Sequence, residues 1–136
     1  MARTRAQRSG AATEFLSFAQ ELMEVAEECS IAGRWRAAGL NAIHASIAAS
    51  DAVCVARLGE SSSAEAHGEA AELLSRSGAP GAAAKAVQFS AVIAKKGVFA
   101  YEARPPERAD AEVLIKRARR LVDWAGEVVR ERPRRI

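Results

Sequence analysis

The stretch from Trp35 to Leu58 constrains the fold of this chain more than any other part of the sequence. It contains no proline and only one glycine, Gly39, and apolar or small side chains occupy almost every side of its helical projection. A helix with this pattern is buried on most of its circumference and needs packing partners on several sides. The stretch therefore predicts a central helix that is enclosed by other helices.

Length and composition favour one all-helical domain. A chain of 136 residues is long enough to bury a core without disulfides or metal ions. Aromatic residues make up only 5% of it and alanine is abundant, which favours closely packed helices over β-sheets. We expect a single domain over residues 13–130, between a basic disordered tail at 1–12 and a basic C-terminal tail at 131–136.

Two further helices are predicted next to the central one in the sequence. Apolar residues recur at helical spacing from Thr13, and this pattern ends near Gly33. The connection to the central helix is short, so the two helices form an antiparallel hairpin. After the central helix, a short helix is predicted over 64–76, where Ser62 and Glu65 have the spacing of a capping box.

Two more helices complete the bundle. One begins at Pro80 and runs towards Gly97, and the last begins at Pro106 and ends around 130–133. Pro105 separates them, because a proline disfavours helical geometry at the residue before it. The sequence thus predicts an all-α, up-and-down bundle of four to five helices.

The net charge of +3 is concentrated at the two ends of the chain. The first twelve residues and the last seven each carry +3, so the residues between them carry −3. The basic excess lies in the predicted tails rather than on a folded face. It is therefore weak evidence for nucleic-acid binding.

The cysteines and the apolar segments bear on the cellular compartment. Along the predicted hairpin, Cys54 lies roughly 20 Å from Cys29, which is too far for a disulfide bond. No apolar run of a secretory signal follows the basic start, and no stretch is expected to approach a membrane span. These features predict a cytoplasmic protein with reduced thiols and no membrane partner.

Polar side chains form one stripe on the central helix. Asn41, His44 and Asp51 lie at helical spacing on an otherwise apolar surface. One interpretation is a polar pocket in which His44 and Asp51 bind a ligand or position a proton. The other is a buried hydrogen-bonded network that fixes the register of the helices, because buried polar groups need partners.

A second group of polar residues follows the fourth predicted helix. Lys95, Lys96, Tyr101 and Arg104 are close together in the sequence. The helix dipole favours lysines at a helix C-terminus, which explains them without any ligand. The alternative is a small anion-binding site for a phosphate or nucleotide.

Motifs for metal or cofactor chemistry are not recognisable. His67 is the only other histidine, and the two histidines and two cysteines do not have the spacing of a zinc site. A Gly-rich phosphate loop, a Gly-x-Ser-x-Gly elbow and a His-Glu-x-x-His pair are also missing. We therefore expect no metal site and no cofactor.

The order of these features resembles the HEPN domains of prokaryotes. The likeness is carried by HASIAASDAVCVARLG at 44–59, AHGEAAELL at 66–74 and AKKGVFAYEARPPERADAEVLIKRARRLVDWA at 94–125, and it extends over residues 13–130. It implies a bundle of four or five helices, often dimeric. The family includes toxin ribonucleases, relatives paired with nucleotidyltransferases, and inactive members.

The motif of the active ribonucleases is missing from this chain. They carry an arginine, then four to six residues, then a histidine, and no arginine precedes His44 or His67 at that spacing. By order along the chain, Lys96 and Tyr101 take the corresponding place. An ordinary tyrosine is a poor base at neutral pH, and a lysine lacks the planar fork that binds phosphate in a bidentate way.

The resulting hypothesis is a non-catalytic, HEPN-like protein that acts by binding. It forms a homodimer and binds a protein partner, such as a nucleotidyltransferase, or a nucleotide or RNA phosphate near Lys96, Tyr101 and Arg104. The alternative is a divergent, metal-independent endoribonuclease of a toxin-antitoxin system, with His44 or His67 as the base. That alternative requires the histidine to open to solvent within reach of Lys96 or Arg104. A third hypothesis is a small-ligand pocket lined by Asn41, His44 and Asp51.

Overall fold

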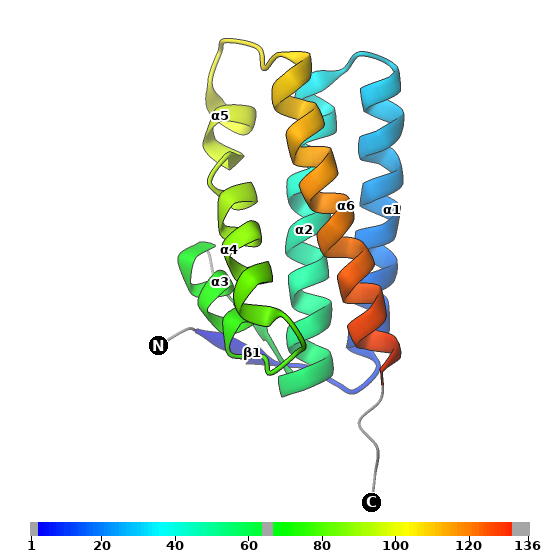
Figure 1. The fold of residues 1–136 in the computed structure, drawn as a ribbon, viewed down its shortest axis with the longest axis vertical. Coiled ribbons are helices and arrows are strands. Elements are labelled where there is room, and N and C mark those ends of the chain that lie inside the picture. Colours follow the sequence, from blue (N-terminus) through cyan, green and yellow to red (C-terminus); the bar gives the residue numbers. More distant parts are fainter. Residues whose placement is uncertain (1–2, 64–66, 132–136) are drawn as a thin grey trace, which may run out of the picture.

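Helices form most of the computed structural model, which describes residues 3–63 and 67–131. Three long helices run side by side (Figure 1): α1 (Ala11–Ile31), α2 (Trp35–Leu58) and α6 (Arg108–Arg130). The shorter elements are β1 (Thr4–Ala6), β2 (Glu60–Ser62), α3 (His67–Ser75), α4 (Ala82–Ile93) and α5 (Lys96–Tyr101). The predicted all-α bundle is confirmed.

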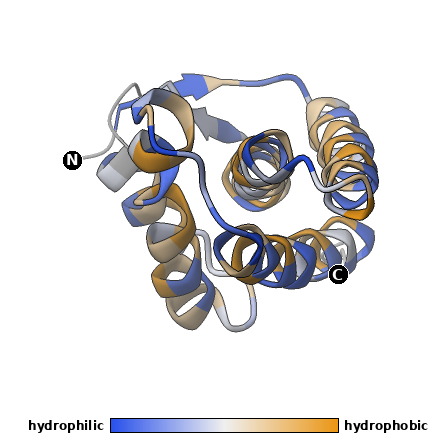
Figure 2. Ribbon diagram, turned by 90° about the horizontal axis from the view of Figure 1, so that it is seen from above, coloured by the Kyte–Doolittle hydropathy of each residue, from blue (hydrophilic) through white to orange (hydrophobic). Residues whose placement is uncertain are grey.

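Helix α2 is the centre of the bundle. Viewed along the long axis, it is surrounded by the other helices (Figure 2), and it contacts α1, α6, α3, α4 and α5. Alanine is the most frequent of its buried residues, and the fully enclosed Ile43 and Val53 lie among them. Small side chains let neighbouring helices approach closely, so α2 is covered on several sides, as its sequence predicts.

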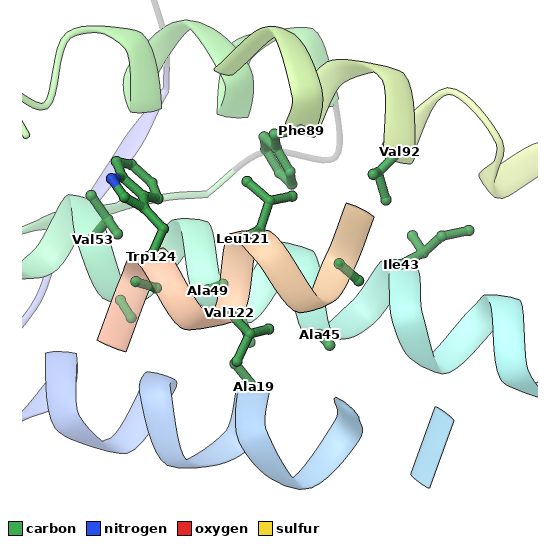
Figure 3. Close-up of a cluster of buried hydrophobic side chains, with 14 of the residues drawn as sticks. Ala19, Ile43, Ala45, Ala49, Val53, Phe89, Val92, Leu121, Val122 and Trp124 are labelled. Carbon is green, nitrogen blue, oxygen red and sulfur yellow. The ribbon is translucent and has the colours of Figure 1, made fainter. Parts of the chain in front are cut away.

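The larger apolar side chains come from the helices around α2. Phe89 of α4 and Leu121 of α6 point towards one another, and Val92 of α4 points towards Ile43 of α2 (Figure 3); each is almost completely buried. Trp124 of α6 packs at the same core, and its indole Nε1 donates a hydrogen bond to the carbonyl oxygen of Pro80 at 2.9 Å. This bond joins α6 to the turn before α4 and satisfies a buried donor.

One sequence expectation about α2 needs correction. By length and composition, Trp35–Leu58 is apolar enough to cross a membrane, whereas the sequence was expected to contain no stretch that approaches a membrane span. Most of the helix is buried inside the bundle, where its alanines and valines contact other helices. The core helix of a folded domain meets the same criteria as a membrane span, so its hydropathy is explained by this packing.

The predicted helix boundaries at Gly33 and before α6 agree with the structure, but the fourth predicted helix does not run to Gly97, because α4 ends at Ile93 and Gly97 lies inside α5. Gly33 adopts a left-handed conformation with φ of 76° in the tight turn between α1 and α2. Helix α6 begins after Pro106, and the Glu107 side chain and Asp110 form a reciprocal capping box at its start. Ser62, which was predicted to begin a capping box, lies in β2 instead, and its partner Glu65 is outside the described residues.

A disordered tail was predicted for residues 1–12, but residues 4–6 form β1, and residues 11 and 12 already belong to α1. Thr4–Ala6 pairs with β2 in an antiparallel register that sets Thr4 opposite Ser62. The Arg3 guanidinium forms an ion pair with Glu69 of α3 at 2.6 Å, and Gln7 donates to the Ser61 hydroxyl at 2.9 Å. A polar, basic composition suggested disorder, but a partner strand distant in the sequence supplies the backbone hydrogen bonds.

Helix α5 fills the segment between α4 and the prolines, and Phe99 anchors it to α2. A Cβ atom built on Gly39 would lie 2.1 Å from Cε2 of the Phe99 ring, so only glycine permits this approach. The Arg36 guanidinium donates to the carbonyl oxygens of Phe99 at 2.9 Å, Glu102 at 2.7 Å and Arg104 at 3.3 Å. Arg36 thus caps the end of α5 and ties the following loop to α2.

We expect Gly39→Ala to lower the free energy of unfolding by about 1–3 kcal/mol, because the added methyl group overlaps a buried aromatic ring. Gly97→Ala is the matched control. A Cβ atom at Gly97 meets nothing within 4 Å, so this variant should gain up to about 1 kcal/mol from the higher helix propensity of alanine. Urea unfolding of both variants measures the difference. Equal stability of the two variants would contradict the close packing at Gly39.

Candidate functional site

A small polar hollow lies where the shorter elements pack on one side of α2. Its volume is about 240 Å³. It is lined by His44, Ile47, Ser50 and Asp51 of α2, Ser62 of β2, Ala70 of α3, Phe89 of α4 and Lys96 of α5. Larger hollows exist, such as the one of about 470 Å³ beside Trp35 and Pro105, but they do not bring together a histidine, a carboxyl group and a lysine.

Helix α2 supplies one wall of the hollow because its residues recur at helical spacing. Ile47 follows His44 by three residues and Asp51 follows Ile47 by four, so all three lie on one face. The His44 side chain is exposed, whereas Ile47 and Asp51 are partly buried. The hollow therefore has an open end at His44 and a more enclosed end at Asp51.

Lys96 approaches His44 because of how α5 is anchored. Phe99 contacts α2 at Gly39, and α5 runs in the opposite direction to α2 (Figure 1). Lys96 precedes Phe99 by three residues, so it lies nearly one turn further along α2, in the direction of His44. The lysine and the histidine thus line the same part of the hollow.

Asp51 is the most electrostatically perturbed carboxyl group of the described chain. Burial raises its pKa from 3.8 to about 7, and the Ser62 backbone N–H, which donates to the carboxylate, opposes this rise. Among the described residues, no lysine or arginine forms an ion pair with it. Near neutral pH, Asp51 can therefore either accept or donate a proton.

Cys54 lies one helical turn beyond Ser50 and is not a reactive thiol. Burial and the nearby Asp51 carboxylate raise the pKa of Cys54 to about 12. A hydrogen bond with the Ser50 side chain lowers this pKa, but by less than burial raises it. A thiol with this pKa is almost entirely protonated at neutral pH. Its role is to fill space in the core, and the chemistry of the hollow rests on its oxygen and nitrogen groups.

Three of the predicted site residues lie away from the hollow. Asn41 donates through Nδ2 to the carbonyl oxygen of Ala37 at 2.8 Å, one turn back on its own helix. The Tyr101 side chain is 82% exposed, at the end of α5. Arg104 is exposed in the loop before α6, where its backbone oxygen accepts a hydrogen bond from Arg36. Lys96 therefore lines the hollow together with His44 and Asp51. Tyr101 and Arg104 do not line it.

Several residues at the hollow were not singled out in the sequence. Ser50 follows Ile47 by three residues, so the helical period could have identified it. Phe89 was assigned to the core, where it is fully buried, although it also closes one side of the hollow. Ser62 could not be placed, because the pairing of β1 with β2 brings it there. The side chain of His67 is outside the described part of the chain.

The arrangement suits hydrogen bonding and proton transfer. Within the described residues, no three histidine, cysteine, aspartate or glutamate side chains come close enough together to hold a metal ion. The hollow offers a lysine ammonium, an imidazole, two hydroxyls and a carboxyl group. Ammonium and imidazole groups are donors that bind phosphate, and a carboxyl group binds hydroxyls or amines.

Fold and site together define this chain as an all-α bundle with a polar hollow beside its central helix. A comparison with models of protein families finds none that matches the chain, and a search of curated proteins finds no match either. The likeness to HEPN domains therefore rests on the sequence features alone.

We expect the stability of the wild-type protein to fall between pH 5 and pH 8, relative to Asp51→Asn. The folded chain keeps the Asp51 proton up to about pH 7, whereas the unfolded chain loses it near pH 3.8. The folded state then binds more protons in this window, so its stability decreases as the pH rises. The expected difference is about 2–3 kcal/mol, measured by urea unfolding at both pH values.

Two other carboxylates with shifted pKa values affect the stability of the fold in a different pH range. Hydrogen bonds from Arg8 and Arg3 lower the pKa values of Glu14 and Glu69 below 4.5, so their contribution to stability is lost only as the pH falls below that value. Identical pH dependence in the wild type and Asp51→Asn between pH 5 and pH 8 would rule out a perturbed Asp51.

Proposed function

We propose that this chain is a non-catalytic, HEPN-like protein that acts by self-association and by binding a phosphate group of a nucleotide or of RNA. The phosphate lies in the hollow, against Lys96 and His44. The observation that carries this proposal is that a lysine from α5 and an exposed histidine from α2 line one hollow.

The charge and position of Lys96 support phosphate binding. Its side chain is partly buried, so a bound anion is less screened by water than it would be at a fully exposed lysine. Lys96 forms no ion pair among the described residues, which leaves its ammonium group available. Tyr101 and Arg104, which lie outside the hollow, are not assigned to the phosphate site.

Self-association is supported by apolar side chains on the outer face of α1. Phe18 is 50% exposed and Val25, two turns later on the same face, is 37% exposed. Such residues favour contact with another apolar surface.

Sedimentation velocity of the wild type and of Phe18→Glu measures this association. We expect the wild type to sediment as a dimer and Phe18→Glu to sediment as a monomer, and a monomeric wild type would refute self-association.

We expect Lys96→Met to weaken the binding of a ribonucleotide about tenfold or more, because a charge-assisted hydrogen bond is lost. Lys95→Met is the matched control, since Lys95 is the adjacent residue with the same charge but lies outside the hollow. Its affinity should stay within about twofold of the wild type. Isothermal titration calorimetry with adenosine 5′-monophosphate measures all three proteins.

Two results would contradict phosphate binding in the hollow. Equal losses in Lys95→Met and Lys96→Met would indicate a diffuse effect of surface charge. No heat of binding from either the nucleotide or inorganic phosphate, with the folded wild-type protein, would remove the proposal altogether.

A second candidate function is metal-independent RNA cleavage, which is favoured by the exposure of His44 next to Lys96. In this reaction the imidazole takes the proton of a ribose 2′-hydroxyl, and the 2′-oxygen attacks the adjacent phosphorus. The 5′-oxygen leaves and takes up a proton, which gives a 2′,3′-cyclic phosphate and a 5′-hydroxyl end. Lys96 stabilises the additional negative charge on the phosphate oxygens.

Incubation of labelled RNA with the protein in the presence of EDTA tests this candidate. If the chain is a ribonuclease, His44→Asn should reduce the rate at least about 100-fold, because a general base is lost, and Lys95→Met should cleave normally. RNA that stays intact with the wild-type protein would leave binding as the function.

A further inference from the structure

The hollow has two chemically different ends. Lys96, with its positive charge, and His44 lie at one end, and Asp51 lies at the other end with the backbone of Ser62. His44 and Asp51 are seven residues apart on α2, which is about 10 Å along the helix axis. A phosphate at Asp51 would meet a carboxyl group, so a bound phosphate belongs at the Lys96 end and a different group belongs at Asp51.

The group that fits Asp51 is a hydrogen-bond donor. The Ser62 N–H occupies one acceptor position of the carboxylate, which has about four in total. Because the pKa of Asp51 is about 7, the charged and the neutral carboxyl are both populated near neutral pH. A hydroxyl group hydrogen bonds with either form, whereas an ammonium group pairs only with the charged one. Vicinal hydroxyls therefore suit this end better than an amine.

Size and the aromatic content of the walls limit how much of a nucleotide enters. Ligand pockets usually span about 300–1,000 Å³, and the hollow of about 240 Å³ is smaller. Among the described lining residues, Phe89 is the one aromatic side chain, and it is completely buried, so it offers no open ring face for a base to stack on. The sugar and the phosphate fit inside, and the base stays outside.

We propose that the hollow recognises the ribose 5′-phosphate part of a ribonucleoside monophosphate, with the phosphate at Lys96 and His44 and the ribose hydroxyls at Asp51. This inference rests on the proposed function, because it requires the phosphate to bind at Lys96. It adds that the site distinguishes ribose from deoxyribose and does not distinguish one base from another.

Calorimetric titration of the full chain with four probes at pH 7 tests this: adenosine, 2′-deoxyadenosine and cytidine 5′-monophosphates, and phosphoethanolamine. For the wild type we expect the deoxyribonucleotide to bind about tenfold more weakly than the ribonucleotide, because it lacks a hydroxyl that bonds to a charged group. The adenine and cytosine ribonucleotides should bind within about twofold of each other. Phosphoethanolamine should bind more weakly than either.

Two variants assign the discrimination to Asp51. Asp51→Asn should bind the ribonucleotide about tenfold more weakly and should lose most of its preference over the deoxyribonucleotide. Asp123→Asn is the matched control on α6, where the carboxylate is exposed and lies 3.7 Å from Arg119, and it should behave as the wild type.

The results that overturn the ribose proposal differ from those that overturn phosphate binding. Equal affinity of the ribo- and deoxyribonucleotide, with binding still dependent on Lys96, would refute ribose recognition and leave the proposed function intact. A tenfold preference for one base, or tighter binding of phosphoethanolamine than of the ribonucleotides, would also refute it. No binding of any probe or of inorganic phosphate would refute both proposals.

Discussion

The close approach of other helices to α2 is the constraint on which the rest of this structure depends. Alanine and glycine at the contact surfaces bring the helix axes together, and the larger Phe89, Leu121 and Trp124 fill the spaces that remain. The contact between Gly39 and Phe99 shows how specific this packing is, because a single methyl group would prevent it. The contact between Gly39 and Phe99 also holds α5 in its position against α2, and it thereby determines where the Lys96 side chain lies.

Much of the fold could be predicted because its signals are local. The apolar or small side chains on almost every side of Trp35–Leu58 predicted its burial, and the two prolines before α6 predicted the break that precedes it. The pairing of β1 with β2 could not be predicted, since each strand has only three residues and carries no hydrophobic alternation. Arg36 was overlooked for a related reason, because its three acceptors are backbone oxygens more than sixty positions away.

The candidate site was predictable in part. Helical periodicity placed His44 and Asp51 on one face of α2, and a single helix is enough for that deduction. The grouping of Lys96 with Tyr101 and Arg104 relied on proximity in the sequence, but the geometry of a short helix followed by a loop separates them. Which of these three residues faces α2 depends on how Phe99 packs, and this is a tertiary contact without a sequence signature. The raised pKa of Asp51 likewise depends on burial by several elements.

The pairing of β1 with β2 has a consequence for how the chain folds. The residues of β1 pair with a strand that follows them by more than fifty positions, because Ala6 lies opposite Glu60, and closing so long a loop costs entropy. The α1–α2 hairpin can form before that strand docks, because its contacts are nearer in sequence. Docking of β1 beside Ser62 is therefore expected to be a late event in folding, and a large fusion partner at the amino terminus would interfere with this step first.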